Sequence, residues 1–342
     1  MYHSPLLFKN IMQIHFNTIS EPDIPGVKWK KLFDAYWPAY YSWLNSKEDA
    51  YVPDLETAQA ALKKYMPKMW PVYERFCNLT NGDPLVARFL TGYQPPSYIS
   101  GCSQAVITES DIQLVRNYDY HPHLIEGNVL LSSWNGKKVI ATSDCLIGAI
   151  DGMNEDGLAV SFTFGGSNFV GKGFGIPFIL RYVLEFCSTV DEAVETLLSI
   201  PSHMTWNVTV IDRAGVFKTI LLSPEQDPII TDASFTTNHQ EFIKWPENAL
   251  FNKTIERSEF LENLLLEKSL SAHKLSNAFL QPPLYNRRFE QGFGTLYTAV
   301  YKPVKGTLQL RWPFQEIHLS FADFREEYKL IKFNQVEGYA YA

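Results

Sequence analysis

The chain of 342 residues has only four cysteines, Cys77, Cys102, Cys145 and Cys187, and no two of them form a CxxC pair. Their irregular spacing argues against both a disulfide framework and a zinc site. The sequence also lacks any window of the roughly 18 to 20 apolar residues that a membrane helix needs. Its first residues do not combine a positive segment, a long apolar run and a small-residue cleavage site. We therefore expect a cytoplasmic protein with no membrane partner.

Long runs of like charge are absent as well. The net charge is -7, and no basic stretch forms a face for a polyanion, so nucleic acid is not an expected partner. No internal repeat or low-complexity linker divides the chain. With 46% hydrophobic and 14% aromatic residues, it can bury a large core, as one big domain or two modest ones.

The first hundred residues read as a short strand followed by helices. The strand is predicted over 11–16, and aromatic residues recur at helical spacing from Trp29 to Leu44, where Pro38 is expected to kink or divide the helix. Further helices are predicted over 54–66, with Asp54 as N-cap, and over 70–79 and 84–90. Because these helices are amphipathic, we expect this leader to lie against the downstream part of the chain.

From residue 102 onward the pattern is that of short strands in blocks. Strands are predicted over 104–107, 112–117, 128–132, 138–142, 145–150, 157–164, 206–211, 216–222, 296–301, 307–311 and 317–320, with turns at 135–136 and 154–157. Helices are predicted over 177–186, 190–200, 252–265 and 269–279. Since strands and helices do not alternate singly, an α+β sandwich fits better than a doubly wound parallel sheet.

One cysteine stands out from the other three. Cys102 follows Gly101 in a turn-like run and immediately precedes an apolar strand. Because Gly101 has no Cβ, its carbonyl can be approached closely and its peptide can adopt strained dihedrals. This geometry suits attack by the Cys102 thiol on the preceding carbonyl. The alternative is that Cys102 is simply a small buried hydrophobic residue.

Five runs in one order resemble the isopenicillin N acyltransferase-like autoproteolytic acyltransferase/hydrolase family of the N-terminal-nucleophile superfamily. Choloylglycine (bile salt) hydrolases are more distant relatives. The runs are GC at 101–102, RNYD at 116–119, DGMNEDGL at 151–158, TNH at 237–239 and GTLYT at 294–298. The resemblance implies a four-layer αββα sandwich with two antiparallel sheets over residues 102–342, preceded by a helical leader over 1–101.

The resemblance also implies the chemistry, which needs no cofactor. The chain would cut itself between Gly101 and Cys102, because the new α-amine, with an ordinary pKa near 8, then serves as the base for the thiol. The enzyme would hydrolyse a small-molecule N-acyl amide, or transfer its acyl group to an amine, through an acyl-Cys102 thioester. After cleavage, the N-terminal fragment would be a partner of the remaining chain. The sequence leaves undecided whether the protein forms a homo-oligomer.

Two residues of the RNYD run are candidates beside the nucleophile. By resemblance, Asp119 orients the amine of Cys102, and Arg116 matches an arginine of the choloylglycine hydrolases. Arg116 and Asp119 at one strand end could hold each other, and a guanidinium beside a thiol favours the thiolate. The alternative is a structural surface ion pair.

The oxyanion of the reaction needs hydrogen-bond donors. By resemblance, the side-chain amide of Asn238 supplies one, although it could instead serve only its own turn. A second is expected from the backbone near Thr163 and Phe164, where choloylglycine hydrolases have an asparagine.

Other residues leave alternatives open. His239 allows a Cys102/His239 thiol hydrolase in an uncleaved chain, and a non-catalytic binding or structural descendant of the sandwich is a further alternative. Tyr118, His239, Arg288 and Tyr297 are candidates for substrate contacts. His121 and His123 lack companions for a metal site, so no metal is expected.

Overall fold

Two β-sheets form the centre of the protein, which we describe from a computed structural model covering residues 12–21, 24–45, 52–109 and 111–333. The larger sheet has nine strands in the order β10 (Gln226–Thr231), β9 (Phe217–Ser223), β8 (Trp206–Ile211), β7 (Ala159–Phe164), β6 (Gly148–Asn154), β5 (Val139–Asp144), β4 (Asn128–Ser132), β1 (Gln13–Glu21) and β15 (Glu327–Lys332). The smaller sheet has six, in the order β11 (Phe235–Thr236), β2 (Gly101–Ile107), β3 (Gln113–Tyr120), β12 (Gly294–Lys302), β13 (Thr307–Trp312) and β14 (Gln315–Ser320).

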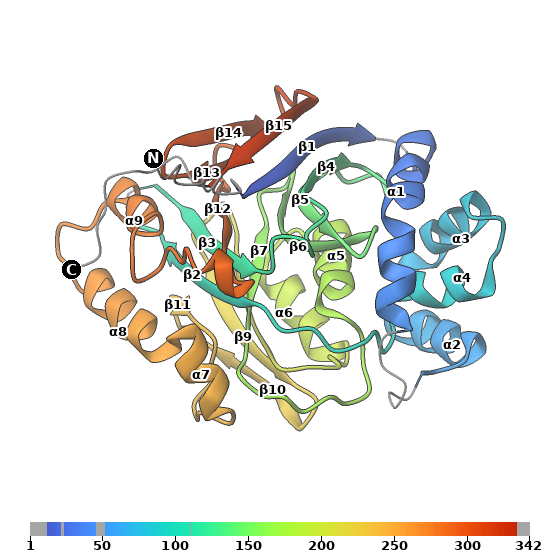
Figure 1. Cartoon of the computed structure of the whole chain (residues 1–342), viewed down its shortest axis with the longest axis horizontal. Helices are drawn as coiled ribbons and strands as arrows, with labels where there is room; N and C mark the ends of the chain where they lie inside the picture. The colour runs from blue at the N-terminus through green and yellow to red at the C-terminus, as the bar shows by residue number, and fades with distance from the viewer. Residues whose placement is uncertain (1–11, 22–23, 46–51, 110, 334–342) are drawn as a thin grey trace, which may run out of the picture.

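The two sheets face each other and carry helices on their outer sides (Figure 1). Polar side chains join the inner faces: Gln104 on β2 donates to Thr209 on β8 and accepts from Ser161 on β7. Helices α5 (Ile176–Phe186) and α6 (Val190–Ser199) cover the larger sheet, and α8 (Thr254–Leu265) and α9 (Ala272–Ala278) cover the smaller one, with α7 (Pro246–Asn252) beside α8. A second apolar core, including Val115, Leu261 and Leu275, lies under α8 and α9. The predicted four-layer αββα sandwich is confirmed.

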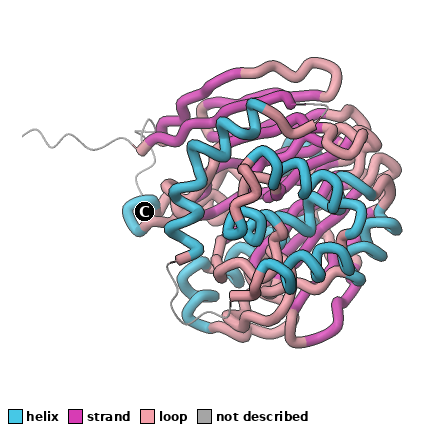
Figure 2. Tube along the Cα trace, turned by 90° about the vertical axis from the view of Figure 1, so that its right-hand side faces the viewer, coloured by secondary structure: helices cyan, strands magenta, loops and turns pink. Residues whose placement is uncertain are grey.

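The leader, residues 1–101, contributes described elements to the sandwich itself. Its helices α1 (Val27–Leu44), α2 (Leu55–Tyr65), α3 (Trp70–Leu79) and α4 (Pro84–Leu90) gather at one end, in front of the strands in Figure 2. Strand β1 pairs antiparallel with β15 and parallel with β4. The resemblance had implied two antiparallel sheets, so the larger sheet departs from that expectation at the β1–β4 pair. The leader therefore supplies a strand of the larger sheet as well as helices packed at its end.

Local signals account for most of the element boundaries. The Asp54 side chain caps α2 by accepting from the amide of Thr57 at 2.7 Å, as predicted. Gly157 has a φ of 82° in the hairpin turn between β6 and β7, also as predicted. Helix α1 runs on through Pro38, so the expected division does not occur. The predicted start of the first strand at residue 11 lies outside the described residues.

Three elements differ from the predictions. The strand predicted over 145–150 starts at Gly148, because Cys145 and Leu146 adopt left-handed φ values of 53° and 68° and close the turn after β5. Helix α7 and strand β15 were not predicted. None of the described helices is long and apolar enough to span a membrane.

Candidate active site

Cys102 is the second residue of β2 and is completely buried. Its amide nitrogen donates to Oδ1 of Asn238 at 3.0 Å, and its carbonyl oxygen accepts from Nη1 of Arg257 at 2.5 Å. Its Sγ lies 3.2 Å from Nη2 of Arg116 and 3.6 Å from the hydroxyl of Ser100. All three polar atoms of this residue are therefore held by side chains that are themselves buried.

Arg116 reaches the sulfur from the neighbouring strand β3. Its Nη1 pairs with Asp151 at 2.6 Å, and its Nε donates to the carbonyl of Phe162 at 2.9 Å. The expectation that Arg116 and Asp119 hold each other is wrong. Residues three apart in a strand point to opposite faces of the sheet, so Arg116 faces the inner side and Asp119 the outer side.

Asp151, on β6, fixes the position of the guanidinium. Its two carboxylate oxygens also accept hydrogen bonds from the hydroxyls of Tyr297 at 2.7 Å, Tyr301 at 2.6 Å and Thr142 at 2.9 Å. Tyr297 is fully buried and uses its hydroxyl on this carboxylate, so in this structure it supports Arg116 rather than lining an open pocket.

The thiol is not activated in the uncut chain. Burial raises the pKa of Cys102, and the nearby Arg116 opposes this shift without overcoming it. The guanidinium thus favours the thiolate, as expected, but desolvation is the larger effect.

Asp119 lies opposite Gly101 in the β2–β3 pairing, beside the peptide bond expected to be cut. It accepts from the hydroxyl of Thr295 at 2.6 Å and lies 3.9 Å from Nη1 of Arg257. Burial raises the pKa of this carboxyl, against the opposing charge of Arg257. Across the described ranges, no hydrogen bond joins Asp119 to Cys102 directly.

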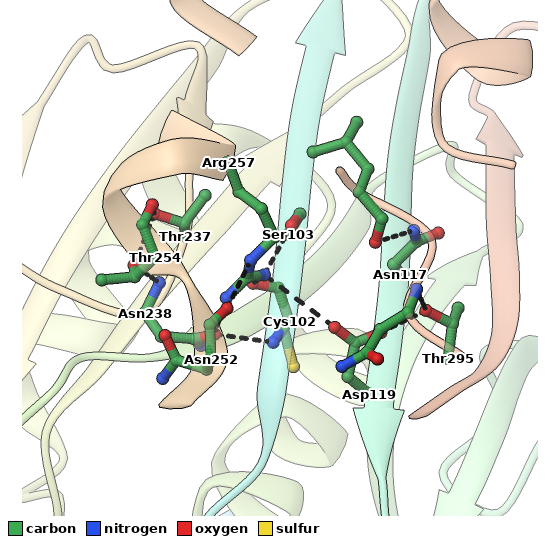
Figure 3. Close-up of polar contacts among 12 residues, drawn as sticks. Cys102, Ser103, Asn117, Asp119, Thr237, Asn238, Asn252, Thr254, Arg257 and Thr295 are labelled. Carbon is green, nitrogen blue, oxygen red and sulfur yellow. Dashed lines mark hydrogen bonds and ion pairs between the residues drawn. The ribbon is translucent and has the colours of Figure 1, made fainter. Parts of the chain in front are cut away.

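Arg257, on α8, links these groups and was not predicted. Figure 3 shows it between Asn238 and Asp119, over the start of β2. Besides the Cys102 carbonyl, it donates to the Ser103 hydroxyl at 2.7 Å, to Oδ1 of Asn238 at 2.6 Å and to the carbonyl of Asn252 at 2.9 Å. A signal was present in the sequence, because Arg257 stands four and seven residues before Leu261 and Leu264, on their buried helix face.

The contacts of Asn238 fix the orientation of its amide group. Its oxygen accepts from both Arg257 and the Cys102 amide, so its Nδ2 points the other way, to the carbonyl of Phe164 at 3.3 Å. Asn238 thus lies beside Cys102, and its Nδ2 makes only one long hydrogen bond, to Phe164.

The end of β7 contributes backbone groups to the same place. Gly165 donates to Thr205 on the β8 side, so by the alternation of an antiparallel pair Thr163 also faces β8, and Phe164 faces away from it. A strand residue directs its N–H and C=O to the same side. Of the two predicted backbone candidates, Phe164 is the one whose N–H faces Asn238.

Gly101 is constrained by close packing. A Cβ on it would lie 2.2 Å from Cζ of Phe293 and 3.1 Å from Cβ of Asp119. Any side chain here would therefore have to displace the Phe293 ring.

Two further candidates, Tyr118 and Arg288, contact residues of the site. The ring of Tyr118 packs on the Arg116 guanidinium, with 4.7 Å between the ring centroid and Cζ. Arg288 lies over the ring of Phe293 at 5.6 Å, on the outer side of the smaller sheet.

His239 is turned toward α8. Its Nδ1 is 2.8 Å from the hydroxyl of Thr254, and burial lowers the pKa of its imidazole. It makes no hydrogen bond with Cys102 in the part of the chain that the structure describes. Within that part, no group of three or more His, Cys, Asp or Glu side chains is arranged to hold a metal ion.

Comparison with known proteins places the chain in a family. The model of the acyl-coenzyme A:6-aminopenicillanic acid acyl-transferase family matches residues 106–316, more than half of the chain. The chain belongs to this family. The match includes Arg116, Asp119, Asn238 and Arg257 and begins four residues after Cys102.

Solved structures with some likeness have low sequence identity. A mutant conjugated bile acid hydrolase from Clostridium perfringens is 14% identical over 70% of this chain and 99% of its own, with a TM-score of 0.41. Penicillin V acylase from Agrobacterium tumefaciens is 14% identical over 65% and 86%, with a TM-score of 0.44. The Caenorhabditis elegans ortholog of N-acylethanolamine-hydrolyzing acid amidase is 17% identical over 60% and 93%, with a TM-score of 0.43. Among curated protein sequences, the comparison finds no match.

Proposed function

We propose that this member of the acyl-coenzyme A:6-aminopenicillanic acid acyl-transferase family is an N-terminal-nucleophile amidohydrolase. It cuts itself between Gly101 and Cys102 and then uses Cys102 to hydrolyse linear, non-peptide amides. The observation that carries the proposal is that three polar side chains contact Cys102. Asn238 contacts its nitrogen, Arg257 its carbonyl oxygen and Arg116 its sulfur. Any buried residue needs partners for its backbone N–H and C=O, but a merely structural buried cysteine needs no arginine beside its sulfur.

Self-cleavage starts from the uncut peptide. The Cys102 sulfur attacks the Gly101 carbonyl carbon, and its proton passes to the nitrogen of Cys102 as the Gly101–Cys102 peptide bond breaks. The product is a thioester between Gly101 and Sγ. Water then attacks this thioester, leaving a carboxylate on Gly101 and a free thiol and amine on Cys102. Asn238 Oδ1, 3.0 Å from that nitrogen, holds it throughout.

Turnover uses the amine that cleavage creates. With an ordinary pKa near 8, it accepts the thiol proton, and the sulfur attacks the substrate amide carbon. The leaving amine takes the proton back as the C–N bond breaks, and water resolves the acyl-Cys102 thioester. Acyl transfer to an amine would proceed from the same thioester, so analysis of the products distinguishes the two reactions.

Two donors serve the oxyanion in this proposal. One is Nδ2 of Asn238, whose direction is set because its oxygen accepts from Arg257 and Cys102. The other is the N–H of Phe164, on the strand edge that faces Asn238. Removing one such donor usually slows turnover by about 100- to 1000-fold. Changing Asn238 to Ala should therefore leave a folded, slow enzyme, and unchanged kinetics would remove Asn238 from this role.

The rival Cys102/His239 pair lacks support from the geometry, because His239 Nδ1 is held by Thr254. A non-catalytic descendant would keep an intact chain with an inert thiol. Both differ from the proposal in what happens to the Gly101–Cys102 bond.

The deciding experiment is the intact mass of freshly purified protein under denaturing conditions. We expect fragments 1–101 and 102–342, whose masses sum to the chain plus one water, and a single uncut species from Cys102→Ala. The Cys102→Ala variant should also lose all amidase activity. Amidase activity retained by that variant, or a wild-type chain that never cuts, would overturn the proposal.

A further inference from the structure

A second feature of interest is a cavity of about 380 Å³ between α1 and the loop that follows β3. Aromatic side chains make much of its wall: Tyr36, Tyr40 and Trp43 from α1, Tyr98 from the segment before the cut, and Tyr120 from the end of β3. Two carboxylates, Glu126 and Asp144, also line it. The cavity thus combines aromatic faces with negative charge.

The two carboxylates share one small polar cluster. The hydroxyl of Tyr40 lies 2.6 Å from Glu126 Oε1 and 2.9 Å from Asp144 Oδ1. Glu126 also accepts from the amide of Leu146 at 2.7 Å and the hydroxyl of Ser143 at 2.8 Å. Burial, together with the charge of Glu126, raises the pKa of Asp144 to about 7. The hydrogen bonds that Asp144 receives within the cluster therefore do not offset its burial and the nearby charge of Glu126.

Three other carboxylates, all fully or almost fully buried, each have an arginine nearby. Asp151 pairs with Arg116, Glu185 with Arg181, and Asp119 faces Arg257. Among the described residues that line the cavity, none is a lysine or arginine. His123, which also lines it, is exposed and forms no ion pair with either acid in the described chain. Among the described residues, this partly buried negative charge has no ion-pair partner of the kind that buried charges usually require.

The backbone beside the carboxylates is strained. Cys145 and Leu146 both have left-handed φ values, 53° and 68°, without being glycine. The leader holds this turn in place: Tyr40 accepts from the Cys145 amide at 2.7 Å, and Trp29 donates to the Leu146 carbonyl at 3.0 Å. Strain maintained by surrounding contacts is typical of binding sites rather than of plain structural turns.

The cavity lies within reach of the nucleophile. Tyr98 precedes Cys102 by four residues, which span at most about 14 Å. Tyr118 is paired with Cys102 across β2 and β3, and its ring centroid is 5.7 Å or less from those of both Tyr120 and Tyr297. Tyr98 is nine-tenths buried, and its hydroxyl has no hydrogen-bond partner in the described part of the chain. Cleavage after Gly101 would make this segment a chain end, free to open a path toward Sγ.

We propose that this cavity binds a cationic ammonium group of the amide substrate, an inference that rests on the function proposed above. The aromatic faces attract the cation, and Glu126 and Asp144 supply negative charge. The ammonium group would bring the positive charge that none of the described side chains lining the cavity supplies as lysine or arginine. The substrate class is therefore an amide that carries an aliphatic ammonium group.

Two matched substrates test this: the para-nitroanilides of ε-aminocaproic acid and of caproic acid, which differ by one ammonium group. We expect the wild-type enzyme to favour the cationic one in kcat/KM. The preference should fall about 10- to 100-fold in Asp144→Asn, as expected when a charged partner is removed. Glu185→Gln, which alters a buried carboxylate outside the cavity, should keep the preference. A wild-type enzyme without preference, or a preference that survives Asp144→Asn, would overturn the proposal.

A second measurement separates this inference from the proposed function. If the wild-type chain never cuts after Gly101, the proposed function fails, but the cavity can still be tested by calorimetry on the uncut Cys102→Ala chain. There we expect n-hexylammonium to bind, n-hexanol not to bind, and Asp144→Asn in the same chain to abolish the ammonium binding. Equal binding of the alcohol, or no binding of the ammonium, would refute the cation site whatever the enzyme does.

Discussion

Changing either member of the Arg116–Asp151 pair should destabilise the protein. The two changes should shift the pKa of the Cys102 thiol in opposite directions. Both side chains are completely buried, and their charged atoms are 2.6 Å apart. Arg116→Met leaves a buried carboxylate, and Asp151→Asn leaves a buried guanidinium. Leaving one partner of such a pair typically costs about 3 to 5 kcal/mol of unfolding free energy. The double variant should lose less stability than the sum of the two single losses, because it leaves no buried charge without its partner.

The effect on the thiol follows from the sign of the charge that is removed. Arg116 Nη2 lies 3.2 Å from Sγ, and this guanidinium is the strongest influence that lowers the pKa of Cys102. Arg116→Met should therefore raise that pKa further. Asp151→Asn removes an anion instead and should lower that pKa. The two variants resemble each other in stability and differ in reactivity.

Stability is measured by urea unfolding, and the thiol by the ultraviolet absorbance of the thiolate as a function of pH, with the matching Cys102→Ser protein subtracted. Arg181→Met is the control, because Arg181 is equally buried in an ion pair with Glu185 but makes no contact with Cys102. Arg181→Met should lower the free energy of unfolding without changing the pKa of the Cys102 thiol. If Arg116→Met and Asp151→Asn shift the thiol pKa in the same direction, the charge of Arg116 does not govern it and the reasoning is wrong.

Three further outcomes can be checked separately. The two fragments should co-elute in native size exclusion and part only in denaturant, because β1 is paired with both β4 and β15; separate native peaks would contradict this. Gly101→Ala should slow self-cleavage because its Cβ would overlap the ring of Phe293, and Phe293→Ala in the same chain should restore the rate followed by mass. Burial lowers the pKa of His203 to about 4, so the folded state resists a proton that the unfolded state accepts. Stability should therefore be full above about pH 6.5 and fall by about 3 kcal/mol toward pH 4, and urea unfolding of His203→Gln should not show that part of the loss.

Much of the fold could be predicted because its signals are local. The block order of strands and helices indicated a sandwich, the cap at Asp54 set the start of α2, and Gly157 marked its turn. The pairing of β1 with β15 could not be predicted, because nothing in residues 13–21 specifies a partner some 300 residues away. The turn at Cys145 and Leu146 was missed because these residue types seldom adopt left-handed φ values, so the usual turn chemistry gives no sign of it.

The candidate site was predictable in its residues more than in its connections. Cys102, Arg116 and Asn238 do meet, but the partner of Arg116 comes from the other sheet rather than from its own strand. Strand alternation alone would have separated Arg116 from Asp119, so that error was avoidable. Arg257 was also within reach, since a charged residue in a buried helical stripe requires a buried partner.

Under the proposed function, the environment of Cys102 in the uncut chain favours self-cleavage over hydrolysis of a substrate. Before cleavage, the Cys102 nitrogen is an amide without basicity, and burial raises the pKa of the thiol. The substrate amide therefore meets neither a base nor a thiolate, whereas the Gly101 carbonyl is already adjacent in the chain. Breaking that bond creates the base and leaves Asn238 Oδ1 beside it, because Arg257 holds the amide in the orientation it already has. The same bond ties down the segment containing Tyr98, so a single cut would both supply the missing base and free the wall between the cavity and Sγ.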